Sequence, residues 1–391
     1  MVFSAARKSV NTINSSKISA YTKGIVALAC VFVNFLIVWS YNMPNEAFFT
    51  TQLPPLAFPP PPPPPACTSE QRSTITSHLC RNRNRCGIAP LNRATRCPNP
   101  TWYDSYYEIL RKRLKEERAS FFGMYIGCNK GYDAVNTLRL GTGKKKYNKT
   151  EWRGQMLGGG NGACGQAYGS EIPLEEENVV IDGTVHCIEA LPVNAEALRN
   201  SVKNLGWDDE LLVKGIAMSD TNGEIYFPNK NDMGAEGFSI ADCEKLGSSK
   251  LQEANCTNVS VTTLDSFMEN TQKKDAGTIH FLSIDVEGFD FDVMKGGTQT
   301  LARTEYLEFE YHSVGHWAKQ SLQDAIKMLD GLGFTCYWAG VDKLWRLEDS
   351  CWLDYYHVHV WSNVACVNRK LNKQLAINME NTFLKTLAEK N

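Results

Sequence analysis

The sequence predicts an α/β protein in which a doubly wound, mostly parallel sheet lies behind an N-terminal transmembrane helix and a stem. From residue 121 onward, short apolar runs alternate with segments of helical spacing, the pattern of strand–helix–strand units in a parallel sheet. Several of these runs end in a carboxylate or in a glycine turn, and such sheets bind ligands at that edge. These two observations carry the prediction.

Length and composition limit the function classes. The chain has 391 residues, enough for one sizeable domain or two smaller ones. Hydrophobic residues make up 43% of it, which is normal for a globular protein with a real core. The formal net charge of -2 shows no basic excess, so we expect no nucleic-acid partner.

The N-terminal segment predicts the membrane topology. Residues 1–23 contain basic side chains and no acidic ones, and residues 24–41 are almost wholly apolar. Eighteen helical residues span about 27 Å, close to the thickness of a hydrocarbon core. The basic flank should stay in the cytosol, and no small-residue cleavage site follows the apolar run. A signal anchor is therefore favoured over a cleaved signal peptide. We expect a single-pass type II protein of the Golgi or endoplasmic reticulum, with the bulk of the chain in the lumen.

Residues 42–100 are interpreted as a proline-rich, cysteine-containing stem. The unbroken proline run 59–65 must form a stiff polyproline II spacer. Twelve of the 13 cysteines lie beyond the anchor, an even number in a compartment that permits disulfides. The four cysteines of the stem are spaced as in a small disulfide-stapled knot rather than a zinc ribbon. Asn148, Asn255 and Asn258 lie in sequons and are candidate N-glycosylation sites.

A domain from 101 to 370 follows the stem, and residues 371–391 are expected to form a C-terminal tail with a short surface helix. An amphipathic helix over 102–119 leads to a strand at 121–126. The turn after this strand contains Gly127, Asn129 and Gly131 and opens a helix at 132–140. Glycines there let the backbone approach a ligand, and a helix N-terminus offers free N–H groups. An ordinary tight turn is the alternative interpretation.

Two further strands end in carboxylates. The strand 185–188 ends in Glu189, and an acid at the tip of the second strand commonly accepts hydrogen bonds from ribose hydroxyls. A third strand at 212–217 leads to Asp220, which starts an Asp-Thr-Asn-Gly turn on the interpretation from the residues alone.

The segment from 279 to 312 carries most of the chemistry. An apolar run, 279–284, ends in Asp285 and Glu287, and a strand at 306–311 delivers Glu310 and His312 to the same edge if the two strands are parallel. Apolar residues at helical spacing lie between these strands, interrupted by two glycines. Helix capping is the structural alternative, but it explains one carboxylate more easily than two. After 312 we expect a helix at 322–332 and strands at 334–338 and 356–361.

This segment resembles the signature of FkbM-type methyltransferases, in which a strand ending in Asp-x-Glu-Gly precedes an acidic-hydrophobic helix and a Lys-Gly turn. The resemblance extends over residues 121–367 in five ordered motifs. The family's glycine loop, usually Asp-x-Gly-Ala-Asn-x-Gly, matches at 127, 129 and 131, but Tyr125 replaces its Asp and Ser283 replaces a Lys before the central acids. The matching residues of the central segment are Asp285, Val286, Glu287, Gly288, Asp290, Lys295 and Gly296.

The resemblance implies S-adenosylmethionine as the cofactor and a hydroxyl oxygen of a small molecule or glycan as the methyl acceptor. Methyl transfer to oxygen needs the donor in line with the hydroxyl and a base to take the proton. The resemblance implies cofactor contacts at Gly127, Asn129, Gly131, Glu189 and Asp220. Candidates for the base, or for positioning the acceptor, are Asp285, Glu287 and His312. The sequence gives no confident metal site, since a cation between Asp285 and Glu287 would lack a third ligand.

Two other interpretations stay open. A type II Golgi glycosyltransferase would share the topology and could bind a metal through Asp290-Phe-Asp292, although this pair falls inside an expected helix and so on divergent faces. A catalytically inactive domain with the same fold would explain Tyr125 and Ser283. Binding of S-adenosylmethionine, of a nucleotide sugar or of neither distinguishes the three.

Overall fold

The computed structural model describes residues 64–79, 91, 94–96, 102, 104–156, 174, 179–228, 243, 256–271, 277–348 and 350–389. The chain divides into a unit of residues 1–59 and a compact unit from Pro60 to Asn391. The expected anchor, 24–41, and most of the stem lie outside the described residues. Among the helices that are described, none is both long and apolar enough to cross a membrane.

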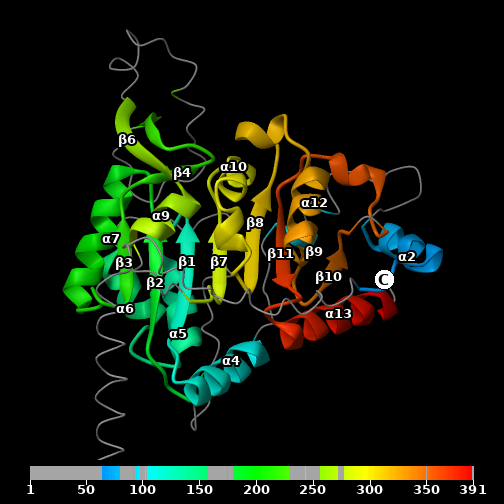
Figure 1. The fold of residues 1–391 in the computed structure, drawn as a ribbon, viewed down its shortest axis with the longest axis horizontal. Helices are drawn as coiled ribbons and strands as arrows, with labels where there is room; N and C mark the ends of the chain where they lie inside the picture. The colour runs from blue at the N-terminus through cyan, green and yellow to red at the C-terminus, as the bar shows by residue number, and fades with distance from the viewer. Residues whose placement is uncertain are drawn as a thin grey trace, which may run out of the picture. The chain divides into compact units, whose positions relative to one another are not determined.

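The compact unit is built on an eight-stranded sheet with the order β10-β9-β11-β8-β7-β1-β2-β3 (Figure 1). The five strands from β3 to β8 in this order are parallel, whereas β11 runs antiparallel to both β8 and β9. The predicted mostly parallel α/β sheet is thereby confirmed. The strands are β1 (Phe121–Ile126), β2 (Gly183–Ile188), β3 (Leu211–Lys214), β7 (Phe281–Ile284), β8 (Tyr306–Tyr311), β9 (Phe334–Ala339), β10 (Leu344–Arg346) and β11 (Ser362–Asn368).

Helices cover both faces of this sheet. Tyr125 of β1 points to α5 (Tyr132–Thr142), where its hydroxyl bonds Thr137. The neighbouring strand position faces the other way, and there His186 of β2 packs edge-on against Phe267 of α9 (Leu264–Thr271). Because β1, β7 and β9 are buried along their whole length, their apolar runs are continuous rather than alternating. The other helices around the core are α4 (Asp104–Glu117), α6 (Lys149–Gln155), α7 (Pro192–Leu205) and α12 (Leu322–Leu332).

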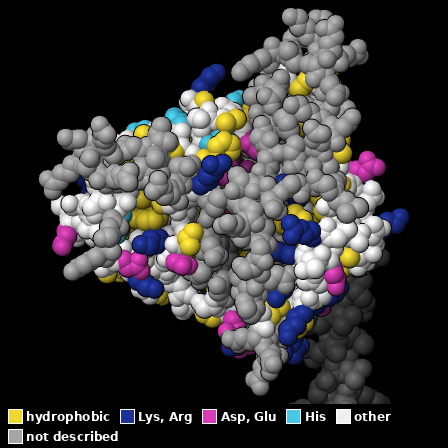
Figure 2. All heavy atoms as spheres, turned by 180° about the vertical axis from the view of Figure 1, so that it is seen from behind, with side chains coloured by type: hydrophobic (Ala, Val, Ile, Leu, Met, Phe, Trp, Pro, Cys, Tyr) yellow, Lys and Arg dark blue, Asp and Glu magenta, His cyan; other side chains and the backbone are white. Residues whose placement is uncertain are grey.

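The order of the strands creates a switch point. From β1 the chain builds outward to β2 and β3, and it then returns to the other side of β1 to form β7 and β8. The crevice between β1 and β7, at the carboxyl ends of these strands, is where open α/β sheets bind ligands. On the face shown in Figure 2, basic and acidic side chains of the described residues are interspersed.

The expected strand 212–217 is wrong as a single strand. It divides into β3, in the main sheet, and β4 (Ala217–Ser219), which belongs to a second sheet with the order β4-β6-β5. The other strands of this second sheet are β5 (Gly223–Pro228) and β6 (Cys256–Thr263). The chain leaves the main sheet at Gly215 and pairs Ala217 with Val261 instead. Pairing of β4 with β6, which is distant in sequence, depends on tertiary contacts, and the local apolar pattern does not reveal it.

The expected strand 356–361 is also wrong. Residues Asp354–His357 form a 3-10 turn, and the strand begins only at Ser362. β11 is inserted between β8 and β9 and is buried along almost all of its length, so it shows no alternation. The alternation of histidine and valine at 357–360 is therefore not evidence of a strand, because these residues lie outside β11.

The two ends of the compact unit pack onto the sheet. The C-terminal helix α13 (Lys373–Ala388) buries Leu375, Met379 and Phe383, which lie one turn apart, and it contacts β10, β11 and α2 (Ser69–Leu79). A disulfide between Cys67 and Cys351 also joins the start of the described chain to this region. The boundaries expected at residues 100 and 370 therefore fall inside one compact unit.

The central helical segment is interrupted, as its glycines predicted. α10 (Asp290–Lys295) and α11 (Thr298–Leu301) are separated by Gly296 and Gly297. A Cβ on Gly296 would lie 2.3 Å from the backbone oxygen of Ser219 in β4. Glycine is required here because the helix end contacts the second sheet directly.

Candidate active site

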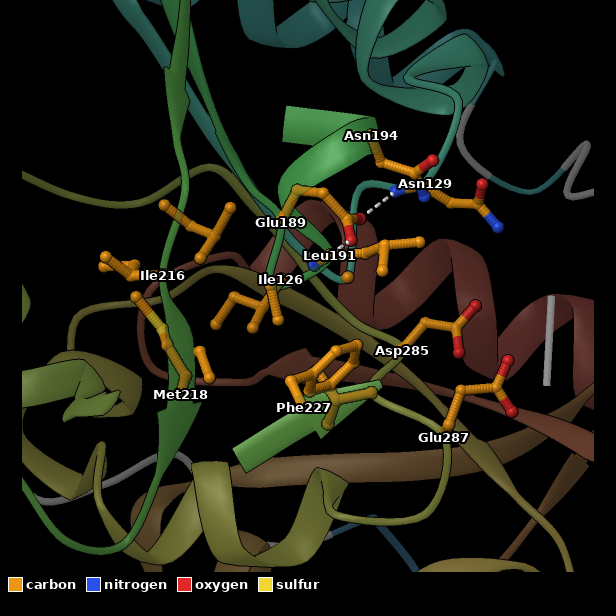
Figure 3. Close-up of a pocket in the computed structure, with 15 residues that line it drawn as sticks. Ile126, Asn129, Glu189, Leu191, Asn194, Ile216, Met218, Phe227, Asp285 and Glu287 are labelled. Carbon is orange, nitrogen blue, oxygen red and sulfur yellow. Dashed lines mark hydrogen bonds between the residues drawn. The ribbon is translucent and has the colours of Figure 1, made fainter. Parts of the chain in front are cut away.

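A cavity opens at the switch point, at the carboxyl ends of β1, β2 and β7 (Figure 3). The second sheet closes its far side through residues of β4 and β5. The cavity is therefore formed by the strand tips of the main sheet and by the segment that leaves this sheet after β3. Its lining residues are Ile126, Gly127, Asn129, Ile188, Glu189, Ala190, Leu191, Asn194, Ile216, Ala217, Met218, Phe227, Asp285, Val286 and Glu287.

The turn after β1 forms one wall. Gly127, Asn129 and Gly131 all have positive φ angles, of 88°, 46° and 74°. A Cβ on Gly127 would lie 1.6 Å from the backbone oxygen of Asp285, so only glycine lets the turn pass this close to β7. Gly131 caps α5 behind the wall, against Trp152 and Leu198, and does not line the cavity. Two of the three predicted loop residues thus face the cavity, and the third supports them.

We expect Gly127→Ala to lower the free energy of unfolding by about 2–5 kcal/mol, because the left-handed conformation and the overpacking against Asp285 both disfavour it. Gly154→Ala, in α6, is the matched control: its Cβ would meet nothing within 4 Å, and we expect a stability equal to or slightly above that of the wild type. Urea unfolding followed by circular dichroism measures both. Equal stability of the two variants would contradict the tight approach of β1 to β7.

Glu189 connects this turn to β2. Its Oε2 accepts a hydrogen bond from the backbone N–H of Asn129 at 2.7 Å, drawn in Figure 3, and its Oε1 accepts one from Leu191 N–H at 2.8 Å. The side chain of Asn194 donates a third bond. Burial raises the pKa of Glu189 to about 7 despite these three donors. Because a carboxylate accepts about four hydrogen bonds, Glu189 is held in place and can still accept from a ligand.

The other end of the cavity is apolar. Met218 and Phe227 line it from the second sheet, and Ile216 lines it from the connection before β4, together with Leu191 and Val286. Such a slot suits a flat, weakly polar group such as a purine base. Sequence reasoning missed Met218 and Phe227, although both flank the turn in which Asp220 was singled out.

Asp220 lies outside this lining. Its carboxylate is 3.7 Å from Lys295 Nζ, at the end of α10, and Gly296 packs against its backbone. The structure thus does not bring Asp220 to the cavity, because the chain leaves the cavity wall after Met218 and turns toward α10.

Asp285 and Glu287 both line the cavity. The backbone N–H of Asp285 donates to Ile126 O at 2.8 Å, which extends the ladder between β1 and β7 by one step and places Asp285 beside Gly127. Glu287 has φ 52°, a left-handed conformation that costs a non-glycine residue about 1–2 kcal/mol. Gly288 fixes this turn, because a Cβ there would lie 2.1 Å from Val314 O. Strain of this kind clusters at ligand-binding turns.

The two carboxylates of α10 have structural roles. Asp290 is fully buried, and its Oδ2 accepts hydrogen bonds from Gly288 N–H and from the indole N–H of Trp317, each at 3.2 Å. Burial, with Asp285 and Glu287 nearby, raises the pKa of Asp290 well above its ordinary value. Asp292 points elsewhere, to His316 at 2.6 Å and to Lys295.

This divergence removes the metal pair that a glycosyltransferase would need. Asp290 and Asp292 bond different partners and do not converge on one point. Among the described residues, no group of three or more histidine, cysteine or acidic side chains could hold a metal ion.

His312 is not part of the cavity. It is fully buried, its ring stacks on Trp361 at 4.5 Å, and its Nδ1 accepts a hydrogen bond from Val314 N–H at 3.0 Å. Burial lowers its pKa to about 4, so the ring is neutral and its proton is on Nε2. The prediction that His312 joins Asp285 and Glu287 is corrected by this geometry, since its one basic nitrogen already has a backbone partner. Its Nε2 lies 4.0 Å from the carboxylate of Glu310.

The two residues that depart from the FkbM pattern lie on neighbouring strands. Tyr125 and Ser283 are register partners on β1 and β7, and Ser283 is the register partner of Glu308 on β8. The Tyr125 hydroxyl bonds Thr137 at 2.7 Å, beneath the cavity rather than in it. Burial raises the pKa of Glu308 to about 8, so this layer is largely neutral. Where the family pattern sets an acid beside a lysine, this chain sets two neutral side chains together.

The model of the methyltransferase FkbM domain matches residues 164–336. Over these residues the chain is similar to FkbM methyltransferases. This match confirms the resemblance inferred from the motifs and supports a methyltransferase with S-adenosylmethionine as its cofactor. The matched range includes Glu189, Asp285 and Glu287, while the glycine turn of β1 precedes it.

A curated protein similar to this chain is the 2-O-methyltransferase NoeI of Sinorhizobium fredii (strain NBRC 101917 / NGR234), which is 29% identical over 132 residues. This match covers 32% of the chain, and the chain spans about half the length of that relative, 52%. Among solved structures, the O-methyltransferase from Bacillus cereus in complex with SAH is similar with 11% identity and a TM-score of 0.27, over 77% of this chain and 91% of that one. So low a score adds no argument to the fold assignment.

The cavity fits the cofactor. Its apolar slot suits adenine, Glu189 can accept a hydrogen bond from a ribose hydroxyl, and Asn129 offers an acceptor near the strand tips. The side-chain oxygen of Asn129 is buried and has no hydrogen-bond partner within the described part of the chain. A buried acceptor of this kind costs free energy unless a donor reaches it, and an ammonium group is such a donor.

Proposed function

We propose that the chain transfers the methyl group of S-adenosylmethionine to a hydroxyl oxygen of a glycan or of another acceptor in the secretory pathway. The observation that carries this proposal is the meeting, in one cavity, of Glu189, the glycine turn of β1 and the carboxylates Asp285 and Glu287. The sulfonium of the cofactor supplies an activated methyl group.

The chain's own residues have separate tasks. Glu189 accepts from the ribose, Asn129 accepts from the amino group of the methionine moiety, and the slot of Ile216, Met218 and Phe227 holds the adenine. Asp285 lies next to Gly127 at the same edge of the sheet, so it would stand beside the donor held by these residues. Asp285 takes the proton of the acceptor hydroxyl as its oxygen attacks, and Glu287 helps to orient the acceptor.

The compartment inferred for the protein supports an acceptor in the secretory pathway. Four disulfides join described cysteines, among them Cys67–Cys351 and Cys336–Cys366, and disulfides persist in oxidising compartments. Together with the apolar run 24–41, they support a type II protein of the Golgi or endoplasmic reticulum with its catalytic domain in the lumen. The named activity of NoeI, 2-O-methyl transfer, favours an oxygen acceptor.

This topology predicts that protease added to intact microsomes leaves residues 100–391 uncut, and that the same region is digested once detergent opens the membrane. An antibody against the C-terminal helix α13 detects the protected fragment. A cytosolic marker domain fused before residue 1 should be removed in both samples and serves as the control. Digestion of the 100–391 region in sealed microsomes would refute the lumenal assignment.

The proposed activity is tested with the full-length protein, radiolabelled S-adenosylmethionine, and fractionated glycans, lipids and proteins from the secretory pathway. We expect label in a hydroxyl-bearing fraction, with S-adenosylhomocysteine as the second product. Calorimetry with a nucleotide sugar is the comparison for the glycosyltransferase alternative. Binding of the nucleotide sugar without binding of S-adenosylmethionine would overturn the proposal, and binding of neither would favour an inactive domain.

A further inference from the structure

We propose that the Cys128–Cys187 disulfide is a positioning element of the methyl-donor site, which holds the glycine turn of β1 against the tip of β2 in the shape that binds the donor. The inference rests on the proposed donor binding and adds a covalent requirement to it. Cys128 stands where the FkbM pattern has alanine, so this bond is a feature of this chain and not of the motif.

The bridge lies directly behind the cavity wall. Cys128 stands between Gly127 and Asn129, and Cys187 precedes Glu189 by two positions. The Cα atoms of the two cysteines are 5.4 Å apart. All three neighbouring residues line the cavity, whereas the cysteines themselves do not and are buried. Loss of the disulfide would therefore affect donor binding by moving the cavity-lining residues beside it, and it would remove no direct contact with the donor.

Hydrogen bonds also hold the turn in place. Gly127 N–H and Cys128 N–H both donate to the same acceptor, Ile188 O, each at 3.0 Å, and Asn129 N–H donates to Glu189. Gly131 N–H also donates to Cys128 O at 2.8 Å, and the indole N–H of Trp152 donates to Lys130 O at 2.7 Å. Asn129 is in a left-handed conformation, which an untethered chain populates rarely at a non-glycine residue. The disulfide adds to these bonds the covalent link between the turn and the tip of β2.

Reduction should weaken donor binding. Dithiothreitol supplies two electrons and two protons, the S–S bond is broken to two thiols, and the reagent becomes its own cyclic disulfide. A released turn must be ordered again whenever the donor binds, and ordering one residue of backbone lowers affinity by about tenfold. Since coupling between two events is reciprocal, donor binding must also favour the disulfide form. A tenfold loss of affinity corresponds to a reduction potential about 30 mV lower in the presence of the donor.

The first test is calorimetric titration of the full-length protein with S-adenosylhomocysteine. We expect Cys128→Ala/Cys187→Ala to bind it at least about tenfold more weakly than the wild type. Cys336→Ala/Cys366→Ala is the matched control, because that bridge is equally buried, joins β9 to β11 and lies outside the cavity lining. Its affinity should stay within about twofold of the wild type, as for a site without coupling to the ligand.

The second test uses the wild type alone and so does not depend on a variant that folds. The protein is equilibrated in dithiothreitol redox buffers with and without S-adenosylhomocysteine, and each disulfide is followed by alkylation and mass spectrometry. We expect the potential of Cys128–Cys187 to fall with ligand and that of Cys336–Cys366 to stay constant. Equal potentials with and without bound ligand, or equal affinity of the first variant and the wild type, would overturn the inference and leave donor binding intact. Failure of the wild type to bind the ligand would instead overturn the proposed function.

Discussion

Asp285→Asn is expected to lower the turnover of methyl transfer by ~10²–10⁴, the usual loss when a general base or its charge is removed. The substitution keeps the size of the side chain and leaves the backbone bond from Asp285 N–H to Ile126 O in place. Donor affinity should change much less, because Glu189, Asn129 and the apolar slot carry that binding. Turnover and donor affinity, measured side by side with the wild type, separate the two effects.

The alternative role for Asp285 is that of an acid favoured near the start of a helix. Asparagine caps a helix nearly as well as aspartate, so in that case turnover and stability would hardly change. Asp324→Asn is the matched control: it removes an exposed acid from the first turn of α12, far from the cavity lining. If Asp285→Asn and Asp324→Asn both retained normal turnover, the catalytic role of Asp285 would be wrong.

The centre of the sheet could be predicted because β1 and β7 are short, wholly buried apolar runs followed by a glycine turn and a carboxylate. Their limits are visible in the sequence, and parallel register then brings Gly127 and Asp285 together at one edge. The same rule placed Glu189 at the next strand tip. For these residues, local pattern and sheet topology agree, which is why the sequence was sufficient.

The prediction of site residues failed where burial of the side chain, or pairing with a strand distant in sequence, determines whether a residue reaches the cavity. His312 follows β8 as Asp285 follows β7, but the ring of His312 is buried against Trp361 and bonds Val314, which no spacing reveals. Asp220 follows a strand that left the main sheet to pair with β6. Met218 was passed over for the same reason, since its place in the cavity depends on that departure.

The sequence predicted that disulfides form but not which cysteines pair. An even number of cysteines beyond the anchor indicated bridges, but the pairing of Cys128 with Cys187 depends on β1 and β2 being neighbours with equal register. That register places residue 128 two steps past the end of β1, where the turn folds back toward β2. Only the folded chain shows that this bridge borders the donor cavity.

Glu189→Gln is expected to weaken binding of S-adenosylmethionine by ~1.5–3 kcal/mol at pH 8, the usual contribution of a hydrogen bond to a charged group. This corresponds to about a 10- to 150-fold loss of affinity. Glutamine keeps the length of the side chain but has one carbonyl acceptor, so it can accept from only one of the two backbone donors, Asn129 N–H or Leu191 N–H. Circular dichroism of the variant checks that its fold is intact. Calorimetric titration of the wild type and the variant at the same pH measures the difference.

The pH dependence of the same two proteins makes the test sharper. Burial raises the pKa of Glu189 to about 7 from an ordinary 4.5, so without ligand the carboxyl holds a proton below about pH 7. Ribose hydroxyls donate to the ionised form, and binding below pH 7 must therefore release that proton. The affinity of the wild type should fall by about tenfold per pH unit below 7, whereas the affinity of Glu189→Gln should stay flat, so that the two curves converge on acidification.

Stability without ligand should change in the opposite sense. Since the folded-state pKa of Glu189 is raised, the folded protein binds the proton more tightly than the unfolded chain does. The resulting stabilisation is fully present below pH 4.5 and is lost as the pH rises through about 7. Glu189→Gln lacks this loss, so its unfolding free energy relative to the wild type should increase between these pH values. Parallel pH profiles of the two proteins, in affinity and in stability, would mean that Glu189 does not titrate in this range. Equal affinity of Glu189→Gln and the wild type at pH 8 would make the assignment of Glu189 to the ribose wrong.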